Sequence, residues 1–206
     1  LEAARYYAQW AGAPDSVYLT KGGNDDYKED INTRSYMTNW LAGGSVFNPH
    51  RQGLGVPVEL SLAVHSDAVT QPDFRSVHGS LAICTTNTAG GLLATGLSRN
   101  LSKDFAQMLL QGLDTDLTKA CGQWNIRDLY DRNYSETRCP VMPSAIIETL
   151  SHQNFPDMRL GHDPNFRFTL ARSLYKTILR FNAKTHHTDY VVAPLAPQQL
   201  CAEFYR

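Results

Sequence analysis

The sequence predicts an α/β domain in which a mostly parallel β-sheet is flanked by helices. Two short apolar runs, residues 58–64 and 143–147, have the length and composition of buried strands. Two longer stretches, residues 98–120 and 163–181, carry apolar side chains at helical spacing. Strand-like and helix-like segments alternate without an internal repeat, and this order favours parallel strands that are joined by helices.

The N-terminal part is expected to contain two helices that are separated by a short strand. Glycine and proline end the first helix, and a Gly-Gly pair ends the second. A loop with glycine and proline then leads into the strand at 58–64. The expected elements are a helix at 3–11, a strand at 17–20, a helix at 28–41 and a loop at 45–55.

The C-terminal part is expected to contain the two long helices, with further strands and loops around them. Ser98 or Ser102 can cap the first of these helices, and Pro164 suits the first position of the second because that position needs no N–H donor. The expected elements are a strand at 79–85, a loop at 86–96, a helix at 98–120, an irregular segment at 124–139, a strand at 143–147, a loop at 151–157 and a helix at 163–181.

The composition fits one globular domain and excludes several classes of function. The 206 residues suffice for one well-packed core, and the net charge of -1 gives no general attraction to nucleic acid. No apolar stretch approaches the length of a membrane span. The four cysteines include no C-x-x-C pair, and Cys84 lies in an apolar run that predicts a buried free thiol. The chain begins with Leu1 instead of Met, which predicts a piece of a longer precursor, so a missing signal peptide says nothing about secretion.

His65 and Glu148 follow the two apolar runs and are the main candidates for chemistry. We expect them on one edge of the sheet, where ligands bind in open α/β folds. His65 is competent to bind a metal, and Asp67 can orient its imidazole by accepting a hydrogen bond from the other ring nitrogen. Burial would raise the pKa of Glu148 toward the range that is useful for proton transfer. A purely structural role stays open for His65, and Glu148 can instead cap a helix or pair with Arg127 or Arg138.

The remaining polar residues carry weaker signals. Asn154, in the loop after Glu148, can bind substrate or form an Asx turn before a proline. His78 is expected to face solvent, and no partner is apparent for His152. Basic side chains on the two long helices lie opposite the apolar stripes, which predicts solvated faces and no nucleic-acid patch.

Several motifs occur in the order found in one enzyme family. Residues 62–68 read LAVHSDA, residues 142–148 read MPSAIIE, and Asn154 follows the second motif. Over about residues 3–182 the sequence resembles the catalytic domain of zinc-dependent N-acetylmuramoyl-L-alanine amidases. Further matches lie at 17–39, 98–101, 125–127, 134–138 and 163–171.

The resemblance implies zinc-dependent hydrolysis of an amide bond in peptidoglycan. It implies that His65 is a metal ligand and that Glu148 is the catalytic residue. Asp67, Arg127 and Asn154 would support the site or bind substrate. The other zinc ligands would come from a remaining N-terminal part of the same protein, because a catalytic zinc usually has three protein ligands.

The sequence is closer still to a group of large secreted Bacteroidetes proteins that are often labelled xanthan lyases. Those proteins carry a golvesin-like domain inserted in the amidase domain and a fibronectin-type module after it. Residues 5–12, 41–44 and 148–155 carry this closer resemblance. It implies a secreted, periplasmic or cell-surface location. It also implies a C-terminal part of a catalytic domain at 1–182, a linker at 183–194 and the start of a fibronectin-type domain at 195–206.

Two departures from the amidase pattern leave other functions open. The loop at 42–57 is longer than in ordinary amidases, and Asp67 stands where the family usually has Asn. Both would alter the pocket. The alternatives are a polysaccharide-active enzyme, as the lyase label suggests, and a non-catalytic module that binds cell-wall glycan.

Overall fold

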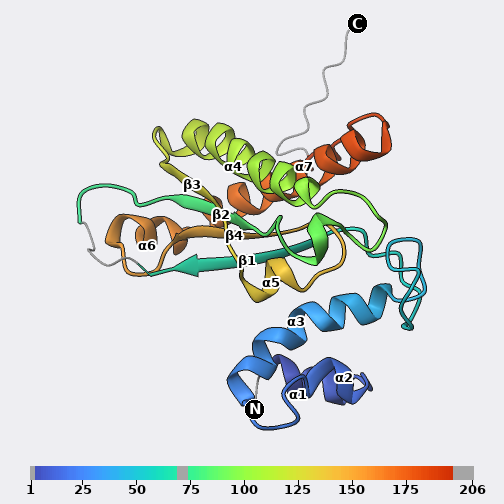
Figure 1. The fold of residues 1–206 in the computed structure, drawn as a ribbon. Helices are drawn as coiled ribbons and strands as arrows, with labels where there is room; N and C mark the ends of the chain where they lie inside the picture. The colour runs from blue at the N-terminus through green and yellow to red at the C-terminus, as the bar shows by residue number, and fades with distance from the viewer. Residues whose placement is uncertain (1–2, 69–73, 197–206) are drawn as a thin grey trace, which may run out of the picture.

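The computed structural model describes residues 3–68 and 74–196, which form a four-stranded sheet with helices on both faces (Figure 1). This mixed α/β architecture confirms the predicted fold class. The strands are β1 (Ser61–Asp67), β2 (Ser80–Cys84), β3 (Ile126–Asp131) and β4 (Ser144–Ser151). The α-helices are α1 (Ala4–Trp10), α2 (Asp15–Tyr18), α3 (Asp26–Ala42), α4 (Asn100–Cys121), α5 (Ser135–Arg138), α6 (Phe155–Gly161) and α7 (Pro164–His186). A short 3-10 turn, η1 (Ala89–Gly91), precedes α4.

The strands lie in the order β1-β4-β2-β3, so β4 is an inner strand. β1 pairs with β4 in parallel and β2 pairs with β3 in parallel, whereas β2 and β4 run antiparallel. β4 is buried along almost its whole length, as expected for a strand that is covered on both faces. The sheet is therefore mostly parallel, as the alternation of strands and helices predicted.

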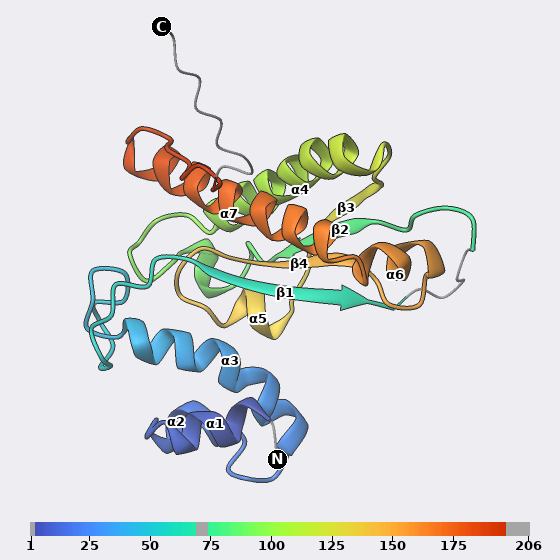
Figure 2. The same cartoon turned by 180° about the vertical axis from the view of Figure 1, so that it is seen from behind.

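Helices α4 and α7 cover one face of the sheet (Figure 2). Four residues of the apolar stripe predicted for α4 are fully buried, because residues four apart share one helix face, and its other two, Leu101 and Met108, are partly buried. Full burial of one such leucine contributes about 1.5–3 kcal/mol. Ala145 and Ile147 of β4 meet this stripe from the sheet, and Phe181 meets it from α7. The four fully buried residues are Phe105, Leu109, Leu113 and Leu117.

The opposite face carries a smaller apolar cluster and the N-terminal helices. Ile83 and Ile146 are buried in this cluster, and Ala63 packs against it. The short helix α5 contacts β4 on this side, and α3 packs on α5 with α1 and α2 beyond it (Figure 1). The Ser135 hydroxyl donates to Asn32 Oδ1 at 2.6 Å, which links α5 directly to α3. No helix in the described part of the chain has the length and apolar character of a membrane span.

The strand predicted at 17–20 is wrong, because the chain forms helix α2 there. Pro14 occupies the N-cap position, and the Tyr18 hydroxyl donates to Asp15 Oδ1 at 2.5 Å across the helical turn. Val17 and Tyr18 are buried against the neighbouring helices instead of joining a sheet. Packing of the apolar pair therefore outweighs its β-propensity.

Three further boundaries differ from the prediction. The segment at 124–139 contains β3 and α5 and is not irregular, and the predicted loop at 151–157 leads directly into α6. Helix α7 continues to His186, so it includes the first residues of the predicted linker at 183–194. Most of the predicted following domain at 195–206 lies outside the described residues.

Candidate functional site

His65 and Glu148 are direct neighbours on the parallel strands β1 and β4. Their Cα positions are partners in the ladder, so both side chains leave the sheet on the same face. Ala63 and Ile146, two residues earlier, are also partners and belong to the apolar cluster on that face. Both strands continue beyond these residues, so the pair lies on a face of the sheet and not just past its strand ends.

Glu136 on α5 contacts His65 from above this face. Its Oε2 lies 3.1 Å from His65 Nε2, and Arg34 on α3 reaches the same oxygen at 3.5 Å. The hydrogen bond to Glu136 raises the pKa of His65, although burial of the ring acts in the opposite direction. Burial alone would raise the pKa of Glu136, but the contacts with His65 and Arg34 together lower it. The pair is therefore held as an imidazolium and a carboxylate over a widened pH range.

Asp67, Arg127 and His78 form a second polar group beside the pair. Arg127 reaches across the sheet from β3, and its guanidinium lies 2.8 Å from Asp67 Oδ2 and 2.7 Å from His78 Nε2. Burial and the charge of Arg127 lower the pKa of His78, which favours a neutral ring that accepts the hydrogen bond. His78 does not simply face solvent, as the sequence suggested.

Glu148 is half-buried, and burial is the main cause that raises its pKa. The charge of Asp67 raises it further, whereas those of His65 and Arg127 lower it. Glu148 Oε2 is buried and has no hydrogen-bond partner among the described residues. Within residues 3–68 and 74–196 Glu148 thus has no direct ion pair, and its environment favours uptake of a proton.

Buried Arg99 fixes the short helix α5 that carries Glu136. The Arg99 side chain is 2% exposed, and its guanidinium donates to four backbone carbonyl groups. Thr85 at the end of β2 adds a hydroxyl contact of 2.7 Å to Thr137. A helix of four residues is not stable by itself, so these bonds are what hold α5 in place. The acceptors of Arg99 are the carbonyls of Leu92, Thr137, Arg138 and Pro140.

Asp157 on α6 ties two strands together at the edge of the site. Its buried carboxylate accepts from the backbone N–H groups of His78 at 2.8 Å, Gly79 at 3.1 Å and Ser151 at 2.8 Å. Asn154 caps the same helix, because its Oδ1 accepts from Asp157 N at 3.1 Å. The structure therefore brings His65, Asp67, Arg127 and Glu148 together and places Asn154, which is 2% exposed, in the helix cap instead.

The described residues do not build a complete zinc centre. A catalytic zinc usually needs three protein ligands. No group of three or more His, Cys, Asp or Glu side chains that can hold a metal ion occurs within residues 3–68 and 74–196. His65 and Glu136 offer two metal-competent side chains in contact with each other, and a zinc ion on His65 Nε2 would have to displace Glu136 from that nitrogen.

Sequence reasoning missed Glu136, Arg34 and His78. Glu136 lies in a segment without periodicity, and Arg34 lies on a helix where an exposed charge is ordinary. No local pattern brings either residue to His65. His152 also gains a partner, since its Nδ1 lies 3.2 Å from the Ser66 hydroxyl.

Comparisons with known proteins identify the fold. No family model matches the sequence, and no curated protein matches it either. Among solved structures, the chain is similar to the N-acetylmuramoyl-L-alanine amidase from Clostridium difficile 630, with a TM-score of 0.54 and 12% identity. That match covers 82% of this chain and 78% of the other.

Two further solved structures share the arrangement. The CwlD amidase from Clostridioides difficile, solved in complex with the GerS lipoprotein, has a TM-score of 0.53 and 15% identity, over 81% of this chain and 68% of the other. The amidase Ami1 from Mycobacterium smegmatis has a TM-score of 0.52 and 19% identity, over 75% of this chain and 61% of the other. The chain therefore spans less than two thirds of the mycobacterial protein. At these identities the likeness shows a shared fold.

Proposed function

We propose that this chain is part of an enzyme that hydrolyses an amide bond of peptidoglycan, of the N-acetylmuramoyl-L-alanine amidase type. The observation that carries the proposal is the pairing of His65 and Glu148 on one face of the sheet. The fold that presents them is shared with three proteins described as such amidases.

Glu148 is the proposed general base and acid. Amide hydrolysis breaks the carbonyl C–N bond, adds the water oxygen to the carbonyl carbon and transfers a proton to the leaving amine. Burial raises the pKa of Glu148, so its carboxylate takes up a proton from water more readily than an exposed one and can then pass it to the amine. Its Oε2 has no hydrogen-bond partner among the described residues, so no direct contact fixes the carboxyl group in one protonation state.

Asp67 and Arg127 are proposed to position the substrate. The two side chains form an ion pair through Arg127 Nη2 and Asp67 Oδ2. Their other polar atoms Asp67 Oδ1 and Arg127 Nε are buried and have no hydrogen-bond partner among the described residues. Arg127 and Asp67 are also 17% and 18% exposed, so the rest of each side chain can present guanidinium donors and a carboxylate acceptor to the C=O and N–H groups of an amide. Asn154 is proposed only as a support of the site, through the cap that orients Asp157.

Zinc dependence is a further part of the proposal. His65 is the one residue of this chain that we propose as a zinc ligand, and the remaining ligands would come from another part of the same protein. Zinc, when bound, would polarise the scissile carbonyl. Glu136 and Arg34 would orient the His65 ring and would release Nε2 when the ion binds.

The substrate implies where the protein acts. Peptidoglycan lies outside the cytoplasmic membrane, so we propose a secreted, periplasmic or cell-surface location. One observation favours a second candidate function: Glu136 Oε2 lies 3.1 Å from His65 Nε2 and so occupies the nitrogen that a metal would need, as expected for a non-catalytic module that binds the cell wall.

Product analysis separates these functions. Peptidoglycan is incubated with the intact protein, and new amino termini and unsaturated sugars are measured. Release of free amino groups in proportion to soluble peptide would support the amidase function. An unsaturated uronate without new amines would mean a polysaccharide lyase, and binding without any product would mean a wall-binding module.

A further inference from the structure

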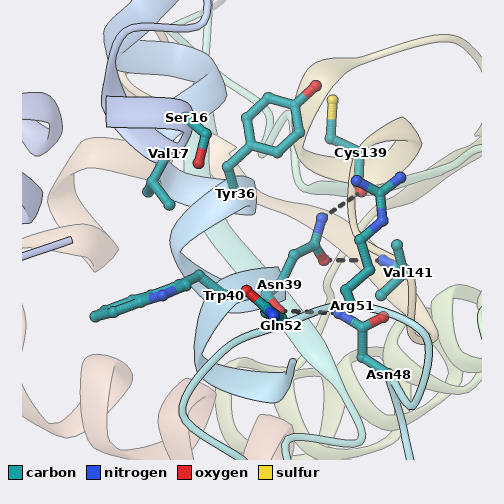
Figure 3. A pocket seen from close by; sticks show the side chains of 10 residues that line it. All are labelled: Ser16, Val17, Tyr36, Asn39, Trp40, Asn48, Arg51, Gln52, Cys139 and Val141. Carbon is teal, nitrogen blue, oxygen red and sulfur yellow. Dashed lines mark hydrogen bonds between the residues drawn. The ribbon is translucent and has the colours of Figure 1, made fainter. Parts of the chain in front are cut away.

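A cavity away from the His65–Glu148 pair is lined by residues from four segments. It lies between helices α2 and α3, the loop at 43–55 and the segment at 139–141, and it has a volume of about 320 Å³ (Figure 3). Such a volume is at the lower end of the range for small-molecule sites. The lining residues are Ser16, Val17, Tyr36, Asn39, Trp40, Asn48, Arg51, Gln52, Cys139 and Val141.

Hydrogen bonds fix the segments that form the wall of this cavity. Asn39 donates to the Cys139 carbonyl at 2.9 Å and accepts from Val141 N at 3.0 Å, which closes the α3 side. The loop folds tightly onto the end of α3, and Leu54 N donates to Trp40 O at 3.1 Å. At Gly53 an added Cβ would lie 1.9 Å from Trp40 O, so only glycine allows this approach.

The charge in the cavity is positive. Arg51 is exposed, and its guanidinium makes no hydrogen bond or ion pair with the described residues. None of the lining residues is acidic. A single planar guanidinium with free donors matches the geometry of a carboxylate.

The remaining groups suit a sugar ring. Figure 3 shows Arg51 and Cys139 on one side of the cavity and Val17 and Trp40 on the other, so a ligand would meet a charged end and an apolar end. The indole of Trp40 offers a flat surface of the kind that packs on the C–H face of a sugar. The 1% exposed side chain of Asn48 borders the cavity with an Oδ1 that has no partner among the described residues.

A peptide ligand fits this cavity less well. Binding of an extended peptide commonly uses main-chain hydrogen bonds from an exposed strand edge. The lining residues come from helices and loops, and their polar groups are mainly side-chain amides and hydroxyls. Such groups pair well with the several hydroxyls of a sugar.

We infer that this cavity binds a sugar that carries a free carboxylate, with Arg51 holding the carboxylate and Trp40 packing on the ring. The identity of that sugar rests on the proposed function, because hydrolysis of a muramoyl amide leaves a carboxylate on the sugar. Helix α3 carries Arg34 of the His65 site and also Tyr36, Asn39 and Trp40 of the cavity. The cavity would thus hold a sugar that has already lost its peptide, while the next amide lies at His65 and Glu148.

The inference is tested by calorimetric titration of the whole chain with two sugars. N-acetylmuramic acid and N-acetylglucosamine differ by the lactyl group that bears the carboxylate. We expect N-acetylmuramic acid to bind at least about tenfold more tightly, the usual worth of one charge-assisted contact. Arg51→Gln should remove this difference, and Arg167→Gln, the same change at an exposed site on α7, should leave it intact.

Three results would overturn the inference. They are equal binding of the two sugars, unchanged binding by Arg51→Gln, and tighter binding of the peptide D-alanyl-D-alanine than of N-acetylmuramic acid. In a second test, N-acetylmuramic acid should change the fluorescence of the parent chain and not that of Trp40→Phe. Amine release from peptidoglycan is measured separately, so loss of the binding site and loss of the hydrolase function are distinguishable.

Discussion

Replacement of Asp157 should strongly destabilise the protein, because one buried carboxylate satisfies three backbone N–H groups. These donors are at the start of β2 and the end of β4, at 2.8, 3.1 and 2.8 Å. A buried donor without a partner costs about 1–3 kcal/mol. In Asp157→Asn the amide oxygen can still accept from Gly79 and Ser151, but the NH₂ group faces the N–H of His78.

The expected loss of unfolding free energy for Asp157→Asn is therefore about 2–3 kcal/mol, one orphaned donor plus the lost charge. Asp157→Ala orphans all three donors and should cost at least roughly 3 kcal/mol and up to about 5 kcal/mol, the upper end of the range for single substitutions. For a domain of this size the loss expected for Asp157→Ala corresponds to a fall in Tm of roughly 6–20 °C. Urea unfolding followed by circular dichroism measures the difference.

Asp163→Asn is the matched control. Asp163 caps α7 through one exposed bond to Asn165 N at 2.9 Å, and Asn is as good a cap as Asp. Its unfolding free energy should change by less than about 0.5 kcal/mol. The account of Asp157 as the tie between β2 and β4 fails if Asp157→Asn costs no more than this control.

Four further outcomes follow from the structure. Glu136→Gln should lower the pKa of His65, seen by NMR titration, because the bond to Glu136 is the main cause of its raised value; an unchanged value would refute the contact. The raised pKa of His65 stabilises the fold below about pH 6.5, and this contribution is lost as the pH rises through the raised value, so Glu136→Gln should flatten the unfolding free energy across that window. The isolated chain should retain less than one zinc per molecule after dialysis, and stoichiometric zinc that survives His65→Ala would contradict the assignment of His65. Burial raises the pKa of Cys84 to about 11, so iodoacetamide at pH 8 should label exposed Cys121 before Cys84, and earlier labelling of Cys84 would contradict its burial.

The sequence predicted the elements whose signals are local. The stripe from Phe105 to Leu117 predicted α4, because burial of one helix face requires that spacing. The aliphatic run before Glu148 predicted the inner strand β4. The expectation that His65 and Glu148 lie near each other in a mostly parallel sheet agrees with the ladder, in which the two residues are direct partners.

Elements and contacts that depend on tertiary context were not predictable. β3 is an edge strand with charged residues along it, so its sequence lacks the apolar pattern of a buried strand. Arg127 of β3 lies over the sheet because it forms an ion pair with Asp67 of β1. The contact between Glu136 and His65 depends on where Arg99 fixes α5, and no spacing in the sequence encodes that position. Val17 lies in a helix because α1 and α3 bury it there.

The most direct test of the proposed hydrolase function is amine release from peptidoglycan by the intact protein carrying Glu148→Gln. Gln keeps the size of the side chain and its hydrogen bonding but cannot take up a proton. The rate should fall by about 10²–10⁴-fold, with unchanged folding by circular dichroism. Glu59→Gln, which removes a carboxylate paired with His186 near the start of β1, should keep the parent rate. A Glu148→Gln protein that releases amines as fast as the parent would contradict the central role of Glu148.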